Sequence, residues 1–191
     1  MSRTALRDRL AAMRLRSAPP AMLCVTGASG AGKTAAAAAV REHIETRLLP
    51  ILSFDSLGVP SPEEMQLGWE TPRGWQKAMT WFWVRAAKTV HRTRPLVLLE
   101  GQFDPQYAVA ACAANGLPRP QIAVLHADAA TLCARVTARG QPALAGDDQA
   151  RWSVYLREAT RDLGGAILDA SRGLAEVADE LCALALPLVP G

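Results

Sequence analysis

Five short apolar runs alternate with helical stretches after residue 20, which predicts a mostly parallel sheet covered by helices on both faces. The apolar runs span residues 21–26, 49–54, 95–99, 121–126 and 166–168. Helices are expected over residues 33–48, from Ser61, from Thr71 to about His91, after the cap Asp128, from about Asp147 and after the cap Ser171. No repeat or low-complexity linker divides residues 21–191, so we expect one three-layer α/β domain.

The first twenty residues form a separate, Arg-rich and amphipathic segment that ends at Pro19 and Pro20. We expect residues 1–20 to be a basic helical extension of the domain at 21–191. A transit peptide has a similar composition, but Asp8 interrupts the positive pattern and no secretory apolar segment follows.

Composition excludes several classes of function. The formal net charge of the 191 residues is only +3, and the cations are dispersed, so nucleic-acid binding is not expected. The four cysteines form no CxxC pair, which argues against structural zinc and favours free thiols. No apolar run is long enough to span a bilayer, so we expect a cytoplasmic protein without a membrane partner. The oligomeric state stays open.

The segment VTGASGAGKT, residues 25–34, carries the most specific chemistry. Residues 27–34 fit the pattern G-x-x-x-x-G-K-[ST], between an apolar strand and a strong helix former. Glycines allow backbone N–H groups to surround phosphate oxygens, and the helix directs its positive N-terminus at the same anion. We therefore expect ATP to be bound with Mg²⁺, Lys33 to reach the β and γ phosphates, and the Thr34 hydroxyl to ligate the metal. The predicted nucleotide-binding residues are Gly27, Ala28, Ser29, Gly30, Ala31, Gly32, Lys33 and Thr34.

Two classes of P-loop protein do not fit the remaining sequence. Guanine-specific GTPases use an N-K-x-D segment, whereas the only asparagine here is Asn115, in the context Ala-Asn-Gly-Leu. Motors of the AAA type need an additional helical domain, for which 191 residues leave little room. Small phosphotransferases and compact ATPases remain.

Four segments in this order resemble the small P-loop kinases, including gluconate kinase, adenylate-kinase-like enzymes and chloramphenicol phosphotransferase. They are GASGAGKT at 27–34, FDS at 54–56, LLEGQ at 98–102 and RVTARGQP at 135–142. The resemblance covers most of the chain from residue 21. In the chloramphenicol enzyme an Asp-Ser pair after the second strand supplies the base for the acceptor hydroxyl, and Asp55-Ser56 is similar to it. The resemblance does not extend to that enzyme's substrate pocket.

Two carboxylates follow predicted strands. Asp55 lies at the carboxyl end of a strand, where ligands bind in doubly wound sheets, and a carboxylate there can deprotonate an attacking hydroxyl. The alternative is an Asp that caps the turn before Gly58. Glu100 ends the buried run LVLLE, at the place where many P-loop proteins hold a magnesium-directed acid, with Asp104 as the competing candidate.

Arg135 and Arg139 are four residues apart on a predicted helix and therefore share a face. The segment GQPALAG, residues 140–146, has the composition of a mobile lid. Arginines on a closing lid can stabilise the charge that develops during phosphoryl transfer. A solvated helix face is an equal alternative from the residues alone, and the kinase resemblance favours the lid.

Four tryptophans lie between the second and third predicted strands, at positions 69, 75, 81 and 83. Related kinases place acceptor-binding helices there, but aromatic residues at these spacings more often pack a core. Trp81 and Trp83 cannot both face the same side of a helix. We expect core packing for most of the four and leave Trp69 or Trp75 open for acceptor binding.

Together these features predict a phosphotransferase that moves the γ-phosphate of Mg-ATP to a hydroxyl of a small molecule. Lys33, Asp55, Arg135 and Arg139 are its expected catalytic residues, and Thr34 and Glu100 its expected metal ligands. A nucleoside or nucleotide kinase fits the same motifs. So does an ATPase or nucleotide sensor that transfers phosphate to no acceptor.

Overall fold

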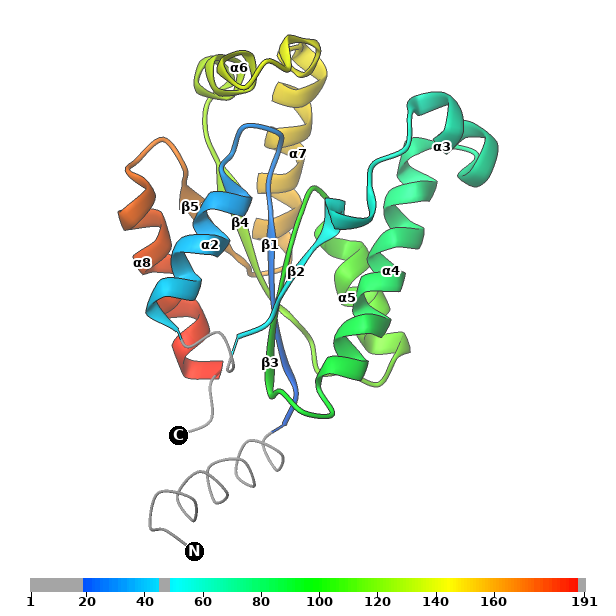
Figure 1. The fold of residues 1–191 in the computed structure, drawn as a ribbon, viewed down its shortest axis with the longest axis vertical. Coiled ribbons are helices and arrows are strands. Elements are labelled where there is room, and N and C mark those ends of the chain that lie inside the picture. Colours follow the sequence, from blue (N-terminus) through cyan, green and yellow to red (C-terminus); the bar gives the residue numbers. More distant parts are fainter. Residues whose placement is uncertain (1–18, 45–48, 189–191) are drawn as a thin grey trace, which may run out of the picture.

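A computed structural model describes residues 19–44 and 49–188. Its centre is a five-stranded sheet in the order β2-β3-β1-β4-β5, and every neighbouring pair of strands is parallel (Figure 1). The strands are β1 (Ala21–Thr26), β2 (Ile51–Ser53), β3 (Leu96–Glu100), β4 (Gln121–His126) and β5 (Ala166–Asp169). The expected α/β class and the parallel sheet are confirmed.

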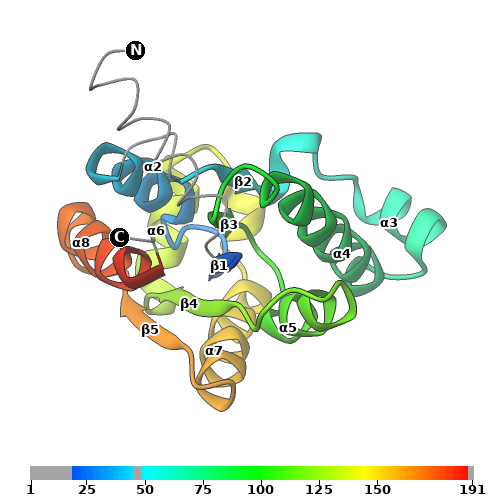
Figure 2. The same cartoon turned by 90° about the horizontal axis from the view of Figure 1, so that it is seen from below.

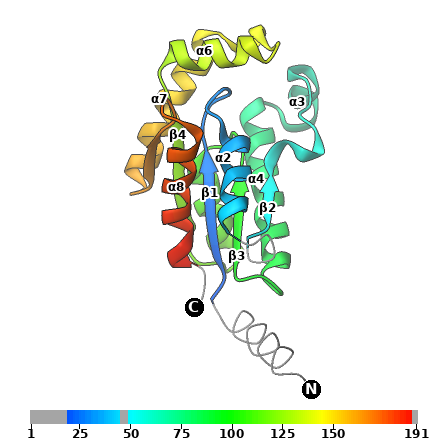
Figure 3. The same ribbon diagram turned by 60° about the vertical axis from the view of Figure 1, so that its left-hand side comes forward.

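Helices cover both faces of this sheet. They are α2 (Lys33–His43), α3 (Pro62–Trp69), α4 (Pro72–Val90), α5 (Pro105–Ala114), α6 (Ala129–Ala138), α7 (Asp147–Asp162) and α8 (Leu174–Ala185). Seen from below, α2 and α8 lie on one face, and α4, α5 and α7 lie on the other (Figure 2). Helix α6 and the 3₁₀ turn Pro142–Leu144 cross above the carboxyl edge of the sheet (Figure 3).

The central strand β1 shows how the sequence builds two cores. Successive side chains of a strand point to opposite faces. Leu23 and Val25 pack in the apolar cluster with α2 and α8. Met22 and Cys24 pack in the second cluster, with residues of α4 and α5. A strand buried on both faces therefore reads as a continuous apolar run.

Several helix starts agree with the predicted capping signals. The Ser61 hydroxyl accepts a hydrogen bond from the Glu64 N–H, and the Glu64 carboxylate accepts one from the Ser61 N–H, which completes a capping box at α3. Thr71 caps α4 and Asp128 caps α6 through the N–H groups of Gly74 and Thr131. Helix α7 begins at Asp147, as expected.

Two boundary predictions were wrong in the segment between β1 and β3. Helix α2 ends at His43, because Ile44 has an extended backbone and is buried in the core, and residues 45–48 lie outside the described part. The second strand covers only Ile51–Ser53. Phe54 leaves it to begin a 3₁₀ turn, where its ring packs against Trp75 and Phe103.

Two helix starts also differ from the sequence predictions. Helix α5 was not predicted, although the sequence carries a signal for its start. Asp104 is the N-cap, and Pro105 follows as the first helical residue. The cap of α8 is Gly173 and not Ser171. Ser171 instead donates its hydroxyl to Asp169 at the end of β5, 2.5 Å away. The Ser171 hydroxyl is therefore bonded to Asp169, which lies close by in the sequence, and not to the first turn of α8.

Residues 45–48 and 189–191 of the domain expected at 21–191 lie outside the described part, and so do residues 1–18 of the expected basic extension. Across the described ranges, no helix is long and apolar enough to cross a membrane.

Candidate nucleotide-binding and phosphotransfer site

The loop Gly27–Gly32 connects β1 to α2 at the carboxyl edge of the sheet (Figure 1). Gly30 has a φ of 85°, and a Cβ atom there would lie 2.8 Å from the carbonyl oxygen of Leu132 in α6. Gly32 has a φ of 87° at the N-cap of α2. Glycine is required at both positions by conformation, and at Gly30 also by the close approach of α6. The loop therefore has the backbone shape that the motif predicts.

Lys33 begins α2 and turns back over the loop, where its ammonium group donates to the carbonyl oxygen of Ala28 at 3.1 Å. Burial lowers the pKa of Lys33 to about 8, and the carboxylates of Glu100 and Asp55 partly oppose this shift. The guanidinium of Arg139 lowers the pKa further. Three predicted site residues are thus close enough to influence the charge of Lys33.

The two predicted metal ligands, Thr34 and Glu100, lie side by side. The Thr34 hydroxyl is 3.3 Å from Glu100 Oε2 and 3.4 Å from Oε1, and the Ser53 hydroxyl donates to Oε1 at 2.5 Å. Only 2% of Glu100 is exposed. Mg²⁺ binds oxygen at about 2.1 Å, so neighbouring ligands lie about 3 Å apart, and the metal usually keeps several waters and phosphate oxygens. A hydroxyl and a carboxylate at this spacing fit such an ion.

The described residues contain no cluster of three His, Cys, Asp or Glu side chains suited to a metal. Mg²⁺ in nucleotide sites is usually bound by one or two carboxylates together with phosphate oxygens and waters. Asp104, the competing candidate, caps α5 by accepting from the Gln106 N–H at 2.9 Å, and it also accepts from the Tyr155 hydroxyl at 2.6 Å. The geometry therefore favours Glu100 over Asp104 as the acid beside Thr34.

Asp55 lies in the 3₁₀ turn directly after β2, and its side chain is exposed. Its carbonyl oxygen accepts from the Gly58 N–H at 3.0 Å. The alternative prediction for Asp55 was that it caps the turn before Gly58. In the structure the backbone carbonyl of Asp55 makes the hydrogen bond of this turn. The carboxylate lies in range of the Lys33 ammonium at the edge of the site.

Two glutamines at the phosphate loop were missed by the sequence analysis. The Ser29 hydroxyl donates to Gln102 Oε1 at 2.9 Å, and the Ser29 N–H donates to Gln149 Oε1 at 3.3 Å. Gln102 follows β3 within the LLEGQ segment, so its place after a strand was a usable signal. Gln149 lies in the first turn of α7, and nothing in the local sequence indicates that it reaches the loop.

Arg135 lies within α6, and one of its guanidinium N–H groups approaches the carbonyl oxygen of Gly30 at 3.5 Å. Arg139 is the C-cap of that helix rather than part of it, and it donates to Gln141 Oε1 at 3.1 Å. The helix ends one residue early because Gly140 follows in the left-handed region, with a φ of 72°. The two arginines still lie one turn apart, beside the phosphate loop.

A cavity of about 210 Å³ adjoins the phosphate loop. It is lined by apolar residues of α2, β4 and α8 and by Arg135 and Arg172. Arg172 lies in the turn after β5, where its side chain pairs with Glu180. A slot with apolar walls and two arginines has the chemistry to stack on a planar base. Arg172 was missed, although it too follows the carboxyl end of a strand.

The tryptophans divide between core and surface. Trp75 and Trp83 are buried, and the Trp83 N–H donates to the carbonyl oxygen of Phe54 at 3.1 Å. Trp81 is partly buried against the same core. Trp69 is 37% exposed and lines a hollow of about 370 Å³ with Leu57, Gly58, Val59, Pro60 and Glu64. Core packing is confirmed for Trp83. Trp75, which the sequence left open for acceptor binding, is also buried in the core, whereas Trp69 is exposed.

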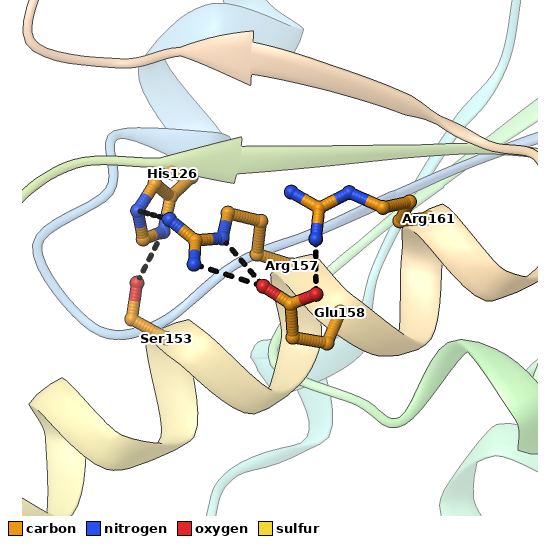
Figure 4. A network of polar contacts seen from close by, with 5 residues as sticks. All are labelled: His126, Ser153, Arg157, Glu158 and Arg161. Carbon is orange, nitrogen blue, oxygen red and sulfur yellow. Dashed lines mark hydrogen bonds and ion pairs between the residues drawn. The ribbon is translucent and has the colours of Figure 1, made fainter.

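A polar network fixes α7 against β4 (Figure 4). The Nδ1 atom of His126 lies 2.9 Å from the Ser153 hydroxyl, and Arg157 approaches the other ring nitrogen at 3.5 Å. Arg157 and Arg161 both pair with Glu158. Burial and the Arg157 charge lower the pKa of His126, which favours a neutral ring. This network holds the helix that carries Gln149.

The fold has clear relatives among solved structures. A shikimate kinase from Acinetobacter baumannii, in complex with shikimate, superposes with a TM-score of 0.60 at 14% identity, over 92% of this chain and 97% of that one. A gluconokinase from Sinorhizobium meliloti has a TM-score of 0.60 at 21% identity, over 90% and 95% of the two chains. A deoxyadenosine kinase from M. mycoides with bound dATP gives 0.58 at 15%, over 86% and 98%. This chain has the fold of the small P-loop kinases.

The likeness lies in the fold and not in close sequence relationship. No protein-family model matches the chain, and no curated protein matches its sequence significantly. The three structures named above are of small-molecule and nucleoside kinases, and at 21% identity or less their likeness to this chain is one of fold. The activity of this chain must therefore be argued from its own residues.

Proposed function

We propose that this protein is a kinase that transfers the γ-phosphate of Mg-ATP to a hydroxyl group of a small molecule. The observation that carries the proposal is the convergence of four groups from three strand ends. Lys33 follows β1, Asp55 follows β2, and Glu100 ends β3 beside Thr34. Carboxyl ends of parallel strands form the ligand crevice of such sheets.

Each group has a distinct task in this proposal. The loop N–H groups and Lys33 bind the β and γ phosphates, while Thr34 and Glu100 hold the magnesium ion, Glu100 directly or through a water. Asp55 accepts the proton of the attacking hydroxyl. Arg135 and Arg139 approach the transferring group from the α6 side and neutralise its charge.

The cavity beside Arg135 and Arg172 serves the base of the nucleotide in this arrangement. It adjoins Gly32, the N-cap of the helix whose N-terminus binds the phosphates in this proposal. The acceptor then occupies the other side of the phosphate loop, near Asp55 and Gln102. The solved structure of a deoxyadenosine kinase with dATP keeps a nucleoside acceptor as the second candidate.

The decisive experiment measures ADP release from Mg-ATP with a panel of sugars, hydroxy acids, nucleosides and nucleotides. We expect one class of acceptor to stimulate release, and the stimulation to vanish in Lys33→Ala and Asp55→Asn. A slow rate that no acceptor changes, and that Asp55→Asn leaves intact, would instead identify an ATPase or nucleotide sensor.

A further inference from the structure

A second group of side chains lies beside the phosphate loop and has no part in the proposed chemistry. The guanidinium carbon of Arg73, in the first turn of α4, lies 5.3 Å from the ring centre of Tyr155 and 5.8 Å from that of Trp152. The two rings are stacked, with centres 5.0 Å apart and an angle of 16° between their planes. Arg73 thus joins α4 to α7 across α5.

The aromatic pair is firmly positioned. The Tyr155 hydroxyl donates to Asp104, which is buried and also accepts from the first turn of α5. Burial and Asp104 raise the pKa of Tyr155 to about 12, so the hydroxyl stays protonated and the ring neutral. Trp152 packs against the apolar cluster that includes Ala28 of the phosphate loop.

The residues that surround Arg73 are connected to the phosphate loop through two sets of contacts. Trp152 is one turn along α7 from Gln149, whose side chain accepts from the Ser29 N–H. Asp104 follows Phe103, which exchanges two hydrogen bonds with Thr26 directly before the loop. Trp152, which contacts Arg73, and Asp104, which binds Tyr155, are therefore both connected to the phosphate loop through their neighbours in the chain.

The edges of the Arg73 guanidinium have no partner in the described chain. Across residues 19–44 and 49–188, Arg73 forms no ion pair with a carboxylate and donates to no protein acceptor, and its side chain is exposed. Stacking on aromatic rings engages only the faces of the guanidinium plane. Its in-plane N–H groups remain available for a forked contact with two oxygens.

The turn before α4 fixes Arg73 at its base. Glu70 has a φ of 65°, and a Cβ atom at Gly74 would lie 2.1 Å from the carbonyl oxygen of Trp69. A non-glycine residue in the left-handed region persists only where its surroundings hold it. The sharp corner between α3 and α4 therefore sets the direction from which Arg73 enters.

We propose that Arg73, held over Trp152 and Tyr155, binds a carboxylate or phosphate group on the acceptor, so that the acceptor is an anionic alcohol. This inference rests on the proposed function for the reaction and adds the class of its substrate. A guanidinium that is already oriented loses little conformational freedom when it binds an anion. Asp104 is the nearby acid. Its carboxylate accepts hydrogen bonds from the Tyr155 hydroxyl and from the Gln106 N–H in the first turn of α5, and it does not pair with Arg73.

Paired probes test this without nucleotide, by titration of the full chain with calorimetry. The pairs are gluconate with glucose, shikimate with its methyl ester, glycerol 3-phosphate with glycerol, and AMP with adenosine. We expect the anionic member of at least one pair to bind 10-fold or more tightly than its neutral partner. The carboxylate and phosphate pairs show which anion is preferred.

Three variants tie that preference to Arg73. Arg73→Gln should reduce the difference within the pair to less than 2-fold, and Arg73→Lys, which keeps the charge without the fork, should retain part of it. Arg85→Gln, at an exposed position of the same helix, should bind as the parent does. Equal binding of the two members of every pair, no binding of any anionic probe at millimolar concentration, or an anion preference that survives in Arg73→Gln would overturn the proposal.

The outcomes separate this inference from the proposed function. Anion binding that depends on Arg73, without any transfer from Mg-ATP, would retain the anion site and reject the kinase. Transfer to a neutral alcohol that is unchanged in Arg73→Gln would retain the kinase and reject the anion site.

Discussion

Thr34 and Glu100 are 66 residues apart in the sequence, yet the threonine hydroxyl lies 3.3 Å from a carboxylate oxygen of the glutamate. The contact forms because β1 and β3 are adjacent parallel strands, with Val25 level with Glu100 in the ladder. Ser53, level with Glu100 on β2, donates to the same carboxylate. Three neighbouring strands thus contribute to one prospective metal site.

Replacement of Glu100 tests that site. Glu100→Gln keeps the shape but removes the charge that attracts Mg²⁺, so we expect half-maximal activity to require roughly 10- to 100-fold more magnesium. Magnesium titration of ADP release measures this, and Glu42→Gln, on the exposed face of α2, is the control. An unchanged magnesium requirement in Glu100→Gln would assign the carboxylate a structural role.

The acid that follows β2 gives a separate prediction. Asp55→Asn should lower kcat by roughly 10²- to 10⁴-fold, because the acceptor hydroxyl loses its base, while ATP affinity changes little. Steady-state kinetics together with nucleotide titration separate the two effects. Asp162→Asn, at the exposed end of α7, should leave both unchanged. Full kcat in Asp55→Asn would contradict the role of base.

The lowered pKa of Lys33 makes ATP binding depend on pH. Free Lys33 loses its proton near pH 8, whereas bound phosphates favour the ammonium form, so binding at pH 9 should take up a proton. ATP affinity should accordingly fall as the pH rises above 8. Calorimetry at pH 9 in two buffers of different ionisation enthalpy measures the uptake, which should be absent in Lys33→Arg because arginine stays charged. Heats that do not depend on the buffer would refute this prediction for the parent protein.

Two glycines of the phosphate loop form a matched pair. Gly30 and Gly32 have nearly the same positive φ, but a Cβ atom meets the Leu132 carbonyl oxygen at position 30 and nothing within 4 Å at position 32. Gly32→Ala should cost roughly 1–2 kcal/mol of unfolding free energy from backbone strain alone. Gly30→Ala should cost more, because α6 must move. Urea unfolding measures the loss of unfolding free energy in each variant. Equal losses would show that α6 moves at no cost to make room for the added Cβ atom.

The network of Figure 4 predicts a loss of stability in acid. The pKa of His126 is lowered in the folded chain, so the unfolded chain binds more protons below its ordinary pKa near 6.5. The free energy of unfolding should therefore fall as the pH drops from 7 to 5. The lowered pKa of His91 acts in the same direction.

His126→Gln should make this pH dependence shallower, as followed by urea unfolding at pH 7 and pH 5. The control is Gln106→Ala, at an exposed position of α5, which removes no titratable group and should keep the slope of the parent. A slope that His126→Gln leaves unchanged would place the acid sensitivity elsewhere in the chain.

Local sequence was sufficient wherever the decisive interactions are close along the chain. The phosphate loop, the capping box at Ser61 and the cap at Asp128 depend on residues within a few positions. The apolar runs also predicted the parallel sheet, because strands buried on both faces need no polar alternation. The predicted boundaries were wrong where contacts between residues far apart in the sequence determine them. Phe54 is an example, because its ring packs against Trp75 and Phe103 and the residue does not continue β2.

The amino-acid sequence alone was therefore enough to predict the α/β fold class, which the structure confirms, and to propose a phosphate-binding loop between β1 and α2. Only the tertiary structure showed that Glu100 is the carboxylate beside Thr34 and that Asp104 caps α5, because the arrangement of the sheet brings Glu100 to that place. It alone placed Gln149 at Ser29 and Arg73 over Tyr155. These contacts join separate helices whose relative positions depend on packing across the whole core, and no short stretch of sequence encodes such packing.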